Sequence, residues 1–128
     1  MCIRDSIYVH RRTQTKDVFP GMYDMFVGGV VGKGESNDLA ATREIAEELG
    51  IVGPIPEPIG RHLYLGPLNR SLVAVYKVTW DGEIRHQPEE VEWGSYMTIE
   101  DIESKTREWD FVPDGLEIWA QLRETKVI

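Results

Sequence analysis

A glycine-rich turn followed at once by an acidic, amphipathic helix limits what this chain can fold into. Ser36, Asn37 and Asp38 are each residues that cap a helix N-terminus, and Gly50 supplies a C-terminal stop. These capping residues predict a helix over residues 37–49. Its apolar positions fall on one stripe that can pack against a core, namely Leu39, Ile45, Ala46 and Leu49.

Three glutamates lie on the face of this helix opposite the apolar stripe. Glu44, Glu47 and Glu48 are three or four positions apart, so their carboxylates converge. They repel one another, and in the local sequence only Arg43, one turn before Glu47, offsets that repulsion. Oxygen ligands of this kind suit a hard cation, with Mg²⁺ first and Mn²⁺ as the near competitor. Taken alone, however, the three glutamates are also typical of a solvated helix face.

The wider segment, residues 29–51, decides between these two interpretations. Gly29 is followed after five residues by Glu35, and after seven more residues comes the run Arg43-Glu44-Ile45-Ala46-Glu47-Glu48-Leu49-Gly50-Ile51. This spacing resembles, position by position, the motif that names the Nudix hydrolase family. Seven fixed residues at average usage would coincide by chance with a probability on the order of 10⁻⁶ in a chain of this length.

The resemblance implies a role for each motif position. Glu47 and Glu48 would be metal ligands, Glu44 would be a ligand or the base that accepts a proton from water, and Gly29 would offer its carbonyl to the metal. The implied cofactor is Mg²⁺, or Mn²⁺ in its place. The implied reaction is hydrolysis of a diphosphate linkage in a nucleoside diphosphate derivative or similar small molecule, by in-line displacement at phosphorus.

Further motif residues would support this trio. Arg43, which the resemblance also places in the catalytic group, would orient the glutamates with its forked donors, and Glu35 would support the site rather than bind the metal directly. Nudix enzymes often add a carboxylate from a later loop. Glu89 and Glu90, just before a predicted strand, are the candidates, with Glu90 favoured and a solvated surface role as its alternative.

Two other functions stay open at this level. Residues 9–24 resemble the branch of the family related to type I isopentenyl diphosphate isomerases, but residues 26–29 lack the cysteine that the isomerase mechanism needs. The chain's one cysteine is Cys2, near the terminus. A nucleotide-sensing Nudix domain without activity is the third reading, although such domains typically have an eroded motif and this one is whole. Hydrolysis is therefore the favoured function.

The order of elements predicts an α/β or α+β fold in three layers, and the resemblance implies an αβα sandwich around a mixed sheet. Strands are expected over residues 7–12, 61–65, 72–80 and 91–97. Thr98 and Asp101 resemble a helix-capping pair, and Pro113 marks the first turn of a last helix. The side chains of that helix expected to pack inward are Leu116, Trp119, Ala120 and Leu122.

The length and the net charge limit what is expected of domain number, partners and localisation. The 128 residues suit one domain, with residues 7–128 as the Nudix domain and residues 1–6 as a foreign terminal addition, so that a first N-terminal strand would be missing. A net charge of −8 disfavours binding to nucleic acid or to an anionic membrane, and leaves a small diphosphate as the expected partner. One cysteine and no apolar span favour the cytoplasm, and the resemblance allows a homodimer.

Overall fold

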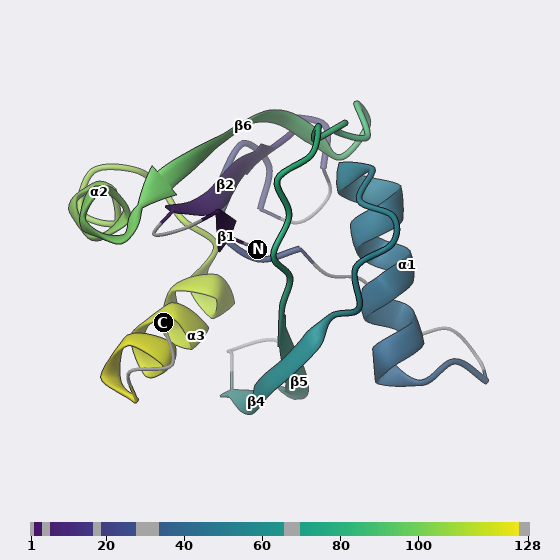
Figure 1. Cartoon of the computed structure of the whole chain (residues 1–128). Coiled ribbons are helices and arrows are strands. Elements are labelled where there is room, and N and C mark those ends of the chain that lie inside the picture. Colours follow the sequence, from purple (N-terminus) through teal and green to yellow (C-terminus); the bar gives the residue numbers. More distant parts are fainter. Residues whose placement is uncertain (1, 4–5, 17–18, 28–33, 66–69, 126–128) are drawn as a thin grey trace.

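A computed structural model describes residues 2–3, 6–16, 19–27, 34–65 and 70–125 of the chain. Figure 1 shows strands and a two-stranded ribbon lying between helix α1 on one side and helices α2 and α3 on the other. The described elements, in chain order, are β1 (Cys2–Ile3), β2 (Ser6–Arg12), β3 (Tyr23–Asp24), α1 (Asn37–Leu49), β4 (Glu57–Leu65), β5 (Arg70–Lys77), β6 (Val91–Thr98), α2 (Ile99–Lys105) and α3 (Pro113–Glu124).

Strand β2 organises the larger sheet. It pairs antiparallel with β1, β3 and β6, and its register with β6 runs from Ser6 opposite Thr98 to Arg11 opposite Trp93. Parallel pairing within the described residues is limited to an isolated bridge between Tyr23 and Phe111. The described ladders of the expected mixed sheet are therefore antiparallel.

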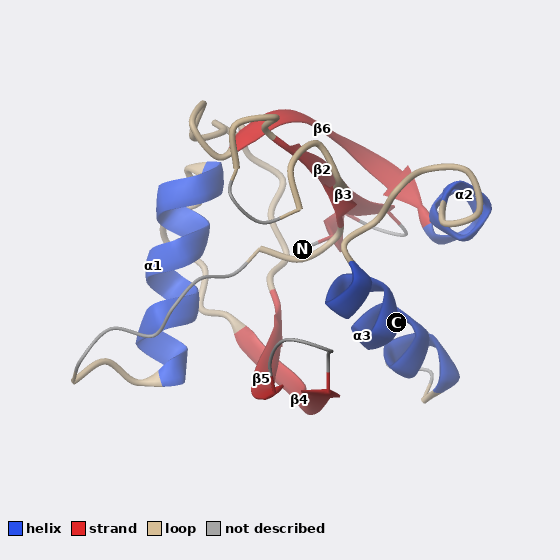
Figure 2. Cartoon of the chain, turned by 180° about the vertical axis from the view of Figure 1, so that it is seen from behind, coloured by secondary structure: helices blue, strands red, loops and turns tan. Residues whose placement is uncertain are grey.

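The alternation of side chains along β2 produces the sandwich. Val9 points into a core cluster with Ile102 of α2 and Trp119 of α3. The preceding residue, Tyr8, points the opposite way, into a second cluster with Leu49 of α1. Neighbouring residues of β2 thus pack against helices on opposite faces of the sheet. This arrangement confirms the predicted α+β sandwich (Figure 2).

The β4–β5 ribbon lies between the lower ends of α1 and α3 (Figure 1). On one side the Tyr76 hydroxyl donates a hydrogen bond to Asp38 Oδ1 at the start of α1, 2.5 Å away. On the other side Val75 packs with Ile118 and Leu122 of α3. Contacts to both helices therefore help to hold the ribbon between them.

A column of rings and cations joins β2, β3 and α2. Tyr23 stacks on Trp109 with ring centroids 4.2 Å apart. The Arg11 guanidinium lies 5.2 Å from the Tyr23 ring centroid, and Lys105 Nζ lies 5.1 Å from the Trp109 ring centroid. A cation thus lies against each ring of a stacked aromatic pair, an arrangement that adds attraction to the buried area of the rings.

The predicted elements are present with shifted ends. The strand expected over 61–65 begins earlier, at Glu57, and a register irregularity between Pro58 and Gly60 accommodates a proline inside the ladder. The strand expected over 72–80 runs over Arg70–Lys77 instead. Among the described residues, no helix is long and apolar enough to cross a membrane.

Two inward-facing assignments are wrong. Leu39 is 60% exposed, because it lies in the first turn of α1 and the core cluster reaches only Ile45 and Leu49 further along the helix. Ala120 is exposed because the buried stripe of α3 follows Gly115, Ile118, Trp119 and Leu122, spaced three or four residues apart.

Candidate metal centre

The ends of α1 are fixed by the residues that the sequence singles out. The Ser36 side chain accepts a hydrogen bond from the Leu39 amide, and the helix begins at Asn37. At the other end Gly50 has a φ of +69°, a left-handed conformation in which its amide donates to the Ala46 carbonyl. The predicted bounds of the helix are therefore confirmed, and the motif glutamates are presented on a rigid element.

Arg43 gathers three carboxylates of the motif. Its Nε and Nη2 atoms donate to the two carboxylate oxygens of Glu35, at 2.8 and 3.0 Å. Its Nη1 atom donates to Glu44 Oε1 at 2.7 Å and to Glu47 Oε2 at 3.2 Å. The carboxylate of Glu35, and then that of Glu44, raises the pKa of Arg43 further above its ordinary value. Arg43 therefore contacts the glutamates that it is predicted to orient, and its role and the supporting role of Glu35 stay predictions.

The three helix glutamates differ in burial. The side chain of Glu44 is 11% exposed, whereas that of Glu47 is 53% exposed. An ordinary solvated helix face does not include a buried carboxylate, because an ionised group rarely leaves water without a partner. Glu44 finds that partner in Arg43, so this face of α1 is organised rather than simply solvated.

Glu48 is the motif glutamate that lies near Glu90, Lys16 and Arg12. Burial, and then the negative charges of Glu44 and Glu90, raise the pKa of Glu48 to about 7, although the cations Lys16 and Arg12 act in the opposite direction. Glu90 therefore lies within electrostatic range of the helix glutamates, as expected for the additional carboxylate. Burial and these two negative charges therefore favour the protonated form of Glu48.

The loop that carries Glu90 is attached to the C-terminal end of α1. The Arg85 amide donates to the Leu49 carbonyl at 2.8 Å, and the Gln87 amide donates to the Glu48 carbonyl at 3.0 Å. These bonds satisfy carbonyl groups that a helix end leaves without partners. They also bring residues 85–90 alongside the motif.

A second attachment joins this loop to the end of β2. The Thr13 amide donates to the Glu90 carbonyl at 3.2 Å, and the Thr13 hydroxyl donates to the Glu89 carbonyl at 3.1 Å. Lys16 contacts the Glu90 carboxylate directly. Glu89, the other candidate from this loop, has an exposed side chain, so the structure brings Glu90 and not Glu89 toward the helix glutamates.

The side chains of the motif have the chemistry to bind a hard divalent cation, but they are not arranged as a complete set of ligands. The donors are carboxylate oxygens, which Mg²⁺ and Mn²⁺ prefer. As the described side chains lie, no three His, Cys, Asp or Glu groups are close enough to hold an ion. Arg43 Nη1 lies between Glu44 and Glu47, where it offsets their charges. Gly29, the expected carbonyl ligand, lies outside the described residues.

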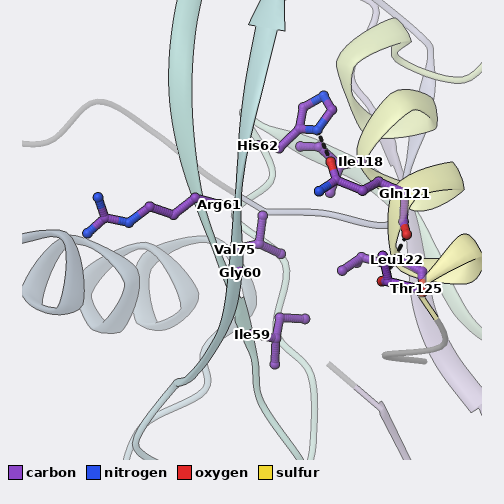
Figure 3. A pocket seen from close by; sticks show the side chains of 9 residues that line it. All are labelled: Ile59, Gly60, Arg61, His62, Val75, Ile118, Gln121, Leu122 and Thr125. Atoms are coloured by element: carbon purple, nitrogen blue, oxygen red, sulfur yellow. Dashed lines mark hydrogen bonds between the residues drawn. The ribbon is translucent and has the colours of Figure 1, made fainter.

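A separate pocket lies on the other side of the β4–β5 ribbon. It has a volume of about 220 Å³, and Figure 3 shows Arg61 extending away from the pocket side chains, toward the opposite side of the ribbon. None of the motif glutamates lines it. The lining residues are Ile59, Gly60, Arg61, His62, Val75, Ile118, Gln121, Leu122 and Thr125. The pocket is therefore separate from the candidate metal centre.

Sequence comparison assigns the fold and the motif to one family. The profile of the NUDIX domain matches residues 3–115. The chain belongs to the Nudix family. An uncharacterized Nudix hydrolase of Streptomyces coelicolor is 51% identical over 119 residues, which are 91% of this chain and 66% of the relative. One of Rhodococcus erythropolis is 38% identical over 125 residues, 89% of this chain and 68% of the relative. The chain thus spans about two thirds of the length of these Nudix relatives.

Solved Nudix structures share the fold. A crystal structure from Deinococcus radiodurans superposes with a TM-score of 0.78 at 24% identity, over 92% of this chain and 75% of that one. The Nudix domain of Shewanella oneidensis NrtR, crystallised with ADP ribose, superposes with a TM-score of 0.71 at 18% identity, over 94% of this chain and 77% of that one. At these identities the likeness concerns the fold.

Sequence reasoning did not select the two cations that face the Nudix motif. Lys16 and Arg12 both lower the pKa of Glu48, so both act at the candidate centre. In the sequence, a solvated surface position is at least as good an interpretation of them as a contact with substrate phosphates. No local signal separates them from Arg11, whose side chain leans over Tyr23 on the other face of the sheet.

Proposed function

We propose that this Nudix domain is a magnesium-dependent hydrolase that cleaves a diphosphate linkage in a nucleoside diphosphate derivative or a similar small molecule. The observation that carries the proposal is the coupling of Glu48 with Glu44 and Glu90. Burial together with their negative charges raises the pKa of Glu48 to about 7, which is the behaviour of carboxylates collected where a cation belongs. The NrtR domain, which binds ADP ribose, supports a nucleotide-like substrate.

The chain's own residues would divide the work. Glu44, Glu47 and Glu48 would hold the metal, with Glu90 as an additional ligand and Gly29 contributing its carbonyl. Arg43 would hold the carboxylates of Glu44 and Glu47 in the orientation that the metal needs. Glu44 would serve as a ligand or accept a proton from water. When bound, Mg²⁺ would polarise the diphosphate oxygens, lower the pKa of water and neutralise the leaving phosphate.

Lys16 and Arg12 would help a polyanion approach this acidic protein. The net charge of −8 repels a diphosphate at long range. Both cations act on Glu48 and Lys16 also contacts Glu90, at the place where substrate phosphates would meet the metal. They would therefore contact the non-bridging oxygens of the substrate, with Arg12 offering the forked donors that match a phosphate group.

Metal removal tests the proposal. We expect phosphate or nucleotide release from a panel of nucleoside diphosphate derivatives and isopentenyl diphosphate in the presence of Mg²⁺, no release with EDTA, and recovery when excess Mg²⁺ or Mn²⁺ is added back. Direct binding of Mn²⁺, followed by electron paramagnetic resonance, gives a second readout that does not depend on the choice of substrate.

Two outcomes would replace the proposal. Conversion of isopentenyl diphosphate to its isomer without phosphate release would assign the isomerase reaction, despite the absence of cysteine from residues 26–29. Nucleotide binding by a folded chain that neither binds Mn²⁺ nor releases phosphate would assign a sensing domain.

Arg43→Lys should lower kcat/KM by about 10- to 100-fold, the usual effect of removing a group that orients metal ligands. Lysine keeps the charge but cannot donate to Glu35, Glu44 and Glu47 at once, as Arg43 does. The measurement is steady-state hydrolysis under saturating Mg²⁺, with exposed Arg107→Lys as the control. Equal activity of the two variants would show that the forked donors of Arg43 are not needed.

A further inference from the structure

Tyr8 joins the central strand to the loop that carries Glu90. Its side chain lies in the core cluster with Leu49 of α1, and its hydroxyl is hydrogen-bonded to Nε2 of His86. The two residues are 78 positions apart in the chain. This bond therefore links β2 with the loop after β5 through side chains.

Gly94 on β6 makes room for this bond. A Cβ atom added at Gly94 would overlap the Tyr8 hydroxyl and lie 2.7 Å from His86 Nε2. Gly94 lies opposite His10 in the β2–β6 register, two positions along the strands from the pair of Tyr8 with Tyr96. Because position 94 has no side chain, the tyrosine can lean across β6 and reach the histidine.

The protonation states suit one direction of donation. Burial, and then Tyr96, raises the pKa of Tyr8 to about 12, so the phenol keeps its proton. Burial lowers the pKa of His86, so the imidazole is neutral at pH 7. The Tyr8 hydroxyl then donates and His86 Nε2 accepts, which leaves the imidazole proton on Nδ1.

His86 lies between the two backbone bonds that attach its loop to α1. The amides on either side of it, those of Arg85 and Gln87, donate to the last carbonyls of the helix. From Gln87 the chain turns, with the Glu90 amide donating to the Gln87 carbonyl at 2.9 Å. The position of His86 therefore sets the start of the turn that brings Glu90 toward Glu48.

We propose that Tyr8 is a positioning residue of the metal centre: through His86 it holds residues 85–90 so that the Glu90 carboxylate stays beside Glu48. The effect of Tyr8 on metal binding rests on the function proposed above. The effect of Tyr8 on the loop does not, because the Tyr8–His86 bond, the turn from Gln87 to Glu90 and the attachment of the loop to α1 all exist without any metal.

The test compares two tyrosine variants of one core cluster. Tyr8→Phe removes the hydroxyl that donates a hydrogen bond to His86. Tyr96→Phe removes a hydroxyl that donates to the Trp80 carbonyl at 3.4 Å. Tyr8→Phe should weaken Mn²⁺ binding by about 10-fold, the effect of losing an outer-shell partner. It should also speed amide hydrogen exchange at Gln87 and Glu90. Tyr96→Phe should change neither by more than about 2-fold.

A Glu90→Gln background shows whether Tyr8 acts through Glu90. In that background Tyr8→Phe should leave the remaining Mn²⁺ affinity unchanged, since the carboxylate that it positions is gone. A further 10-fold loss there would overturn the proposal, because Tyr8 would be acting on the other glutamates or on the fold as a whole.

Hydrogen exchange separates failure of this inference from failure of the proposed function. If the wild-type chain binds no Mn²⁺, the metal-dependent function fails, and exchange at Gln87 and Glu90 still reports on the loop. Faster exchange at these amides in Tyr8→Phe than in Tyr96→Phe would then support the positioning role. Equal exchange in the two variants would overturn it, whatever the metal result.

Discussion

Glu48→Gln should lower kcat/KM for the diphosphate substrate by at least about 100-fold, because losing a ligand should cost more than losing the groups that orient it. Glutamine keeps the shape of the side chain and one carbonyl oxygen but removes the charge that would hold the metal. Steady-state hydrolysis across a range of Mg²⁺ concentrations measures the effect. The loss should persist at saturating Mg²⁺ if Glu48 acts in the transition state.

The same substitution should make the folded chain more stable above pH 7. The folded pKa of Glu48 is raised to about 7 from an ordinary value of 4.5, so its stabilising contribution is complete below pH 4.5 and is lost as the pH rises through 7. Glutamine does not ionise and avoids that loss. Allowing for screening by solvent, we expect a gain of about 1–2 kcal/mol at pH 8 without metal.

The control is Glu57→Gln, an exposed glutamate on β4. It should change neither kcat/KM nor stability. A Glu48→Gln variant that is less stable and still active would contradict both the metal role and the repulsion among the carboxylates. Lower activity with higher stability is the signature of a group kept for function rather than for folding.

Asp24→Asn should stabilise the domain by roughly 3 kcal/mol at pH 7, as judged by urea unfolding. Burial, and to a lesser degree the charge of Asp114, raises the pKa of Asp24 to about 8 from 3.8. Its stabilising contribution is therefore complete below pH 3.8 and is lost as the pH rises through 8. Asparagine keeps an oxygen to accept the hydrogen bond from the Phe26 amide, which is 3.1 Å from Asp24 Oδ1.

The pH dependence distinguishes this effect from better packing. The difference in unfolding free energy between Asp24→Asn and the wild type should grow from pH 4 to pH 8, where ionisation of the carboxyl becomes costly. Burial lowers the pKa of His10 to about 4, so His10 destabilises both proteins equally in acid. Its contribution therefore cancels in the difference between their unfolding free energies. A difference that does not change with pH would show that Asp24 is ionised in the folded chain.

The neighbourhood of Asp24 explains why this carboxyl group cannot move into solvent easily. A Cβ atom at Gly115 would overlap Asp24 Oδ1, so the first turn of α3 approaches the carboxyl group closely. Only the glycine of that turn allows the approach. Nothing in the sequence marks the environment of Asp24, which is half-buried, because it follows Tyr23 in a two-residue strand with no periodicity to interpret.

Local features of the chain were predictable where the physical cause is local. Ser36 and Gly50 mark the ends of α1, because a cap and a left-handed stop depend on residues within one turn. The contact of Arg43 with Glu47 follows from helical spacing in the same way. Leu39 and Ala120 were misplaced because a helical stripe says which face is apolar but not how far along the helix the core extends.

The amino-acid sequence by itself determined the acidic helix, its bounds and the Nudix motif, since each depends on residues a few positions apart. Only the tertiary structure decided that Lys16 meets Glu90 across 74 positions and that Tyr8 reaches His86 across 78. Those contacts depend on the β2–β6 register and on a loop attached to the end of α1. Side chains so distant along the chain are brought together by backbone pairing, which no local pattern of residues specifies.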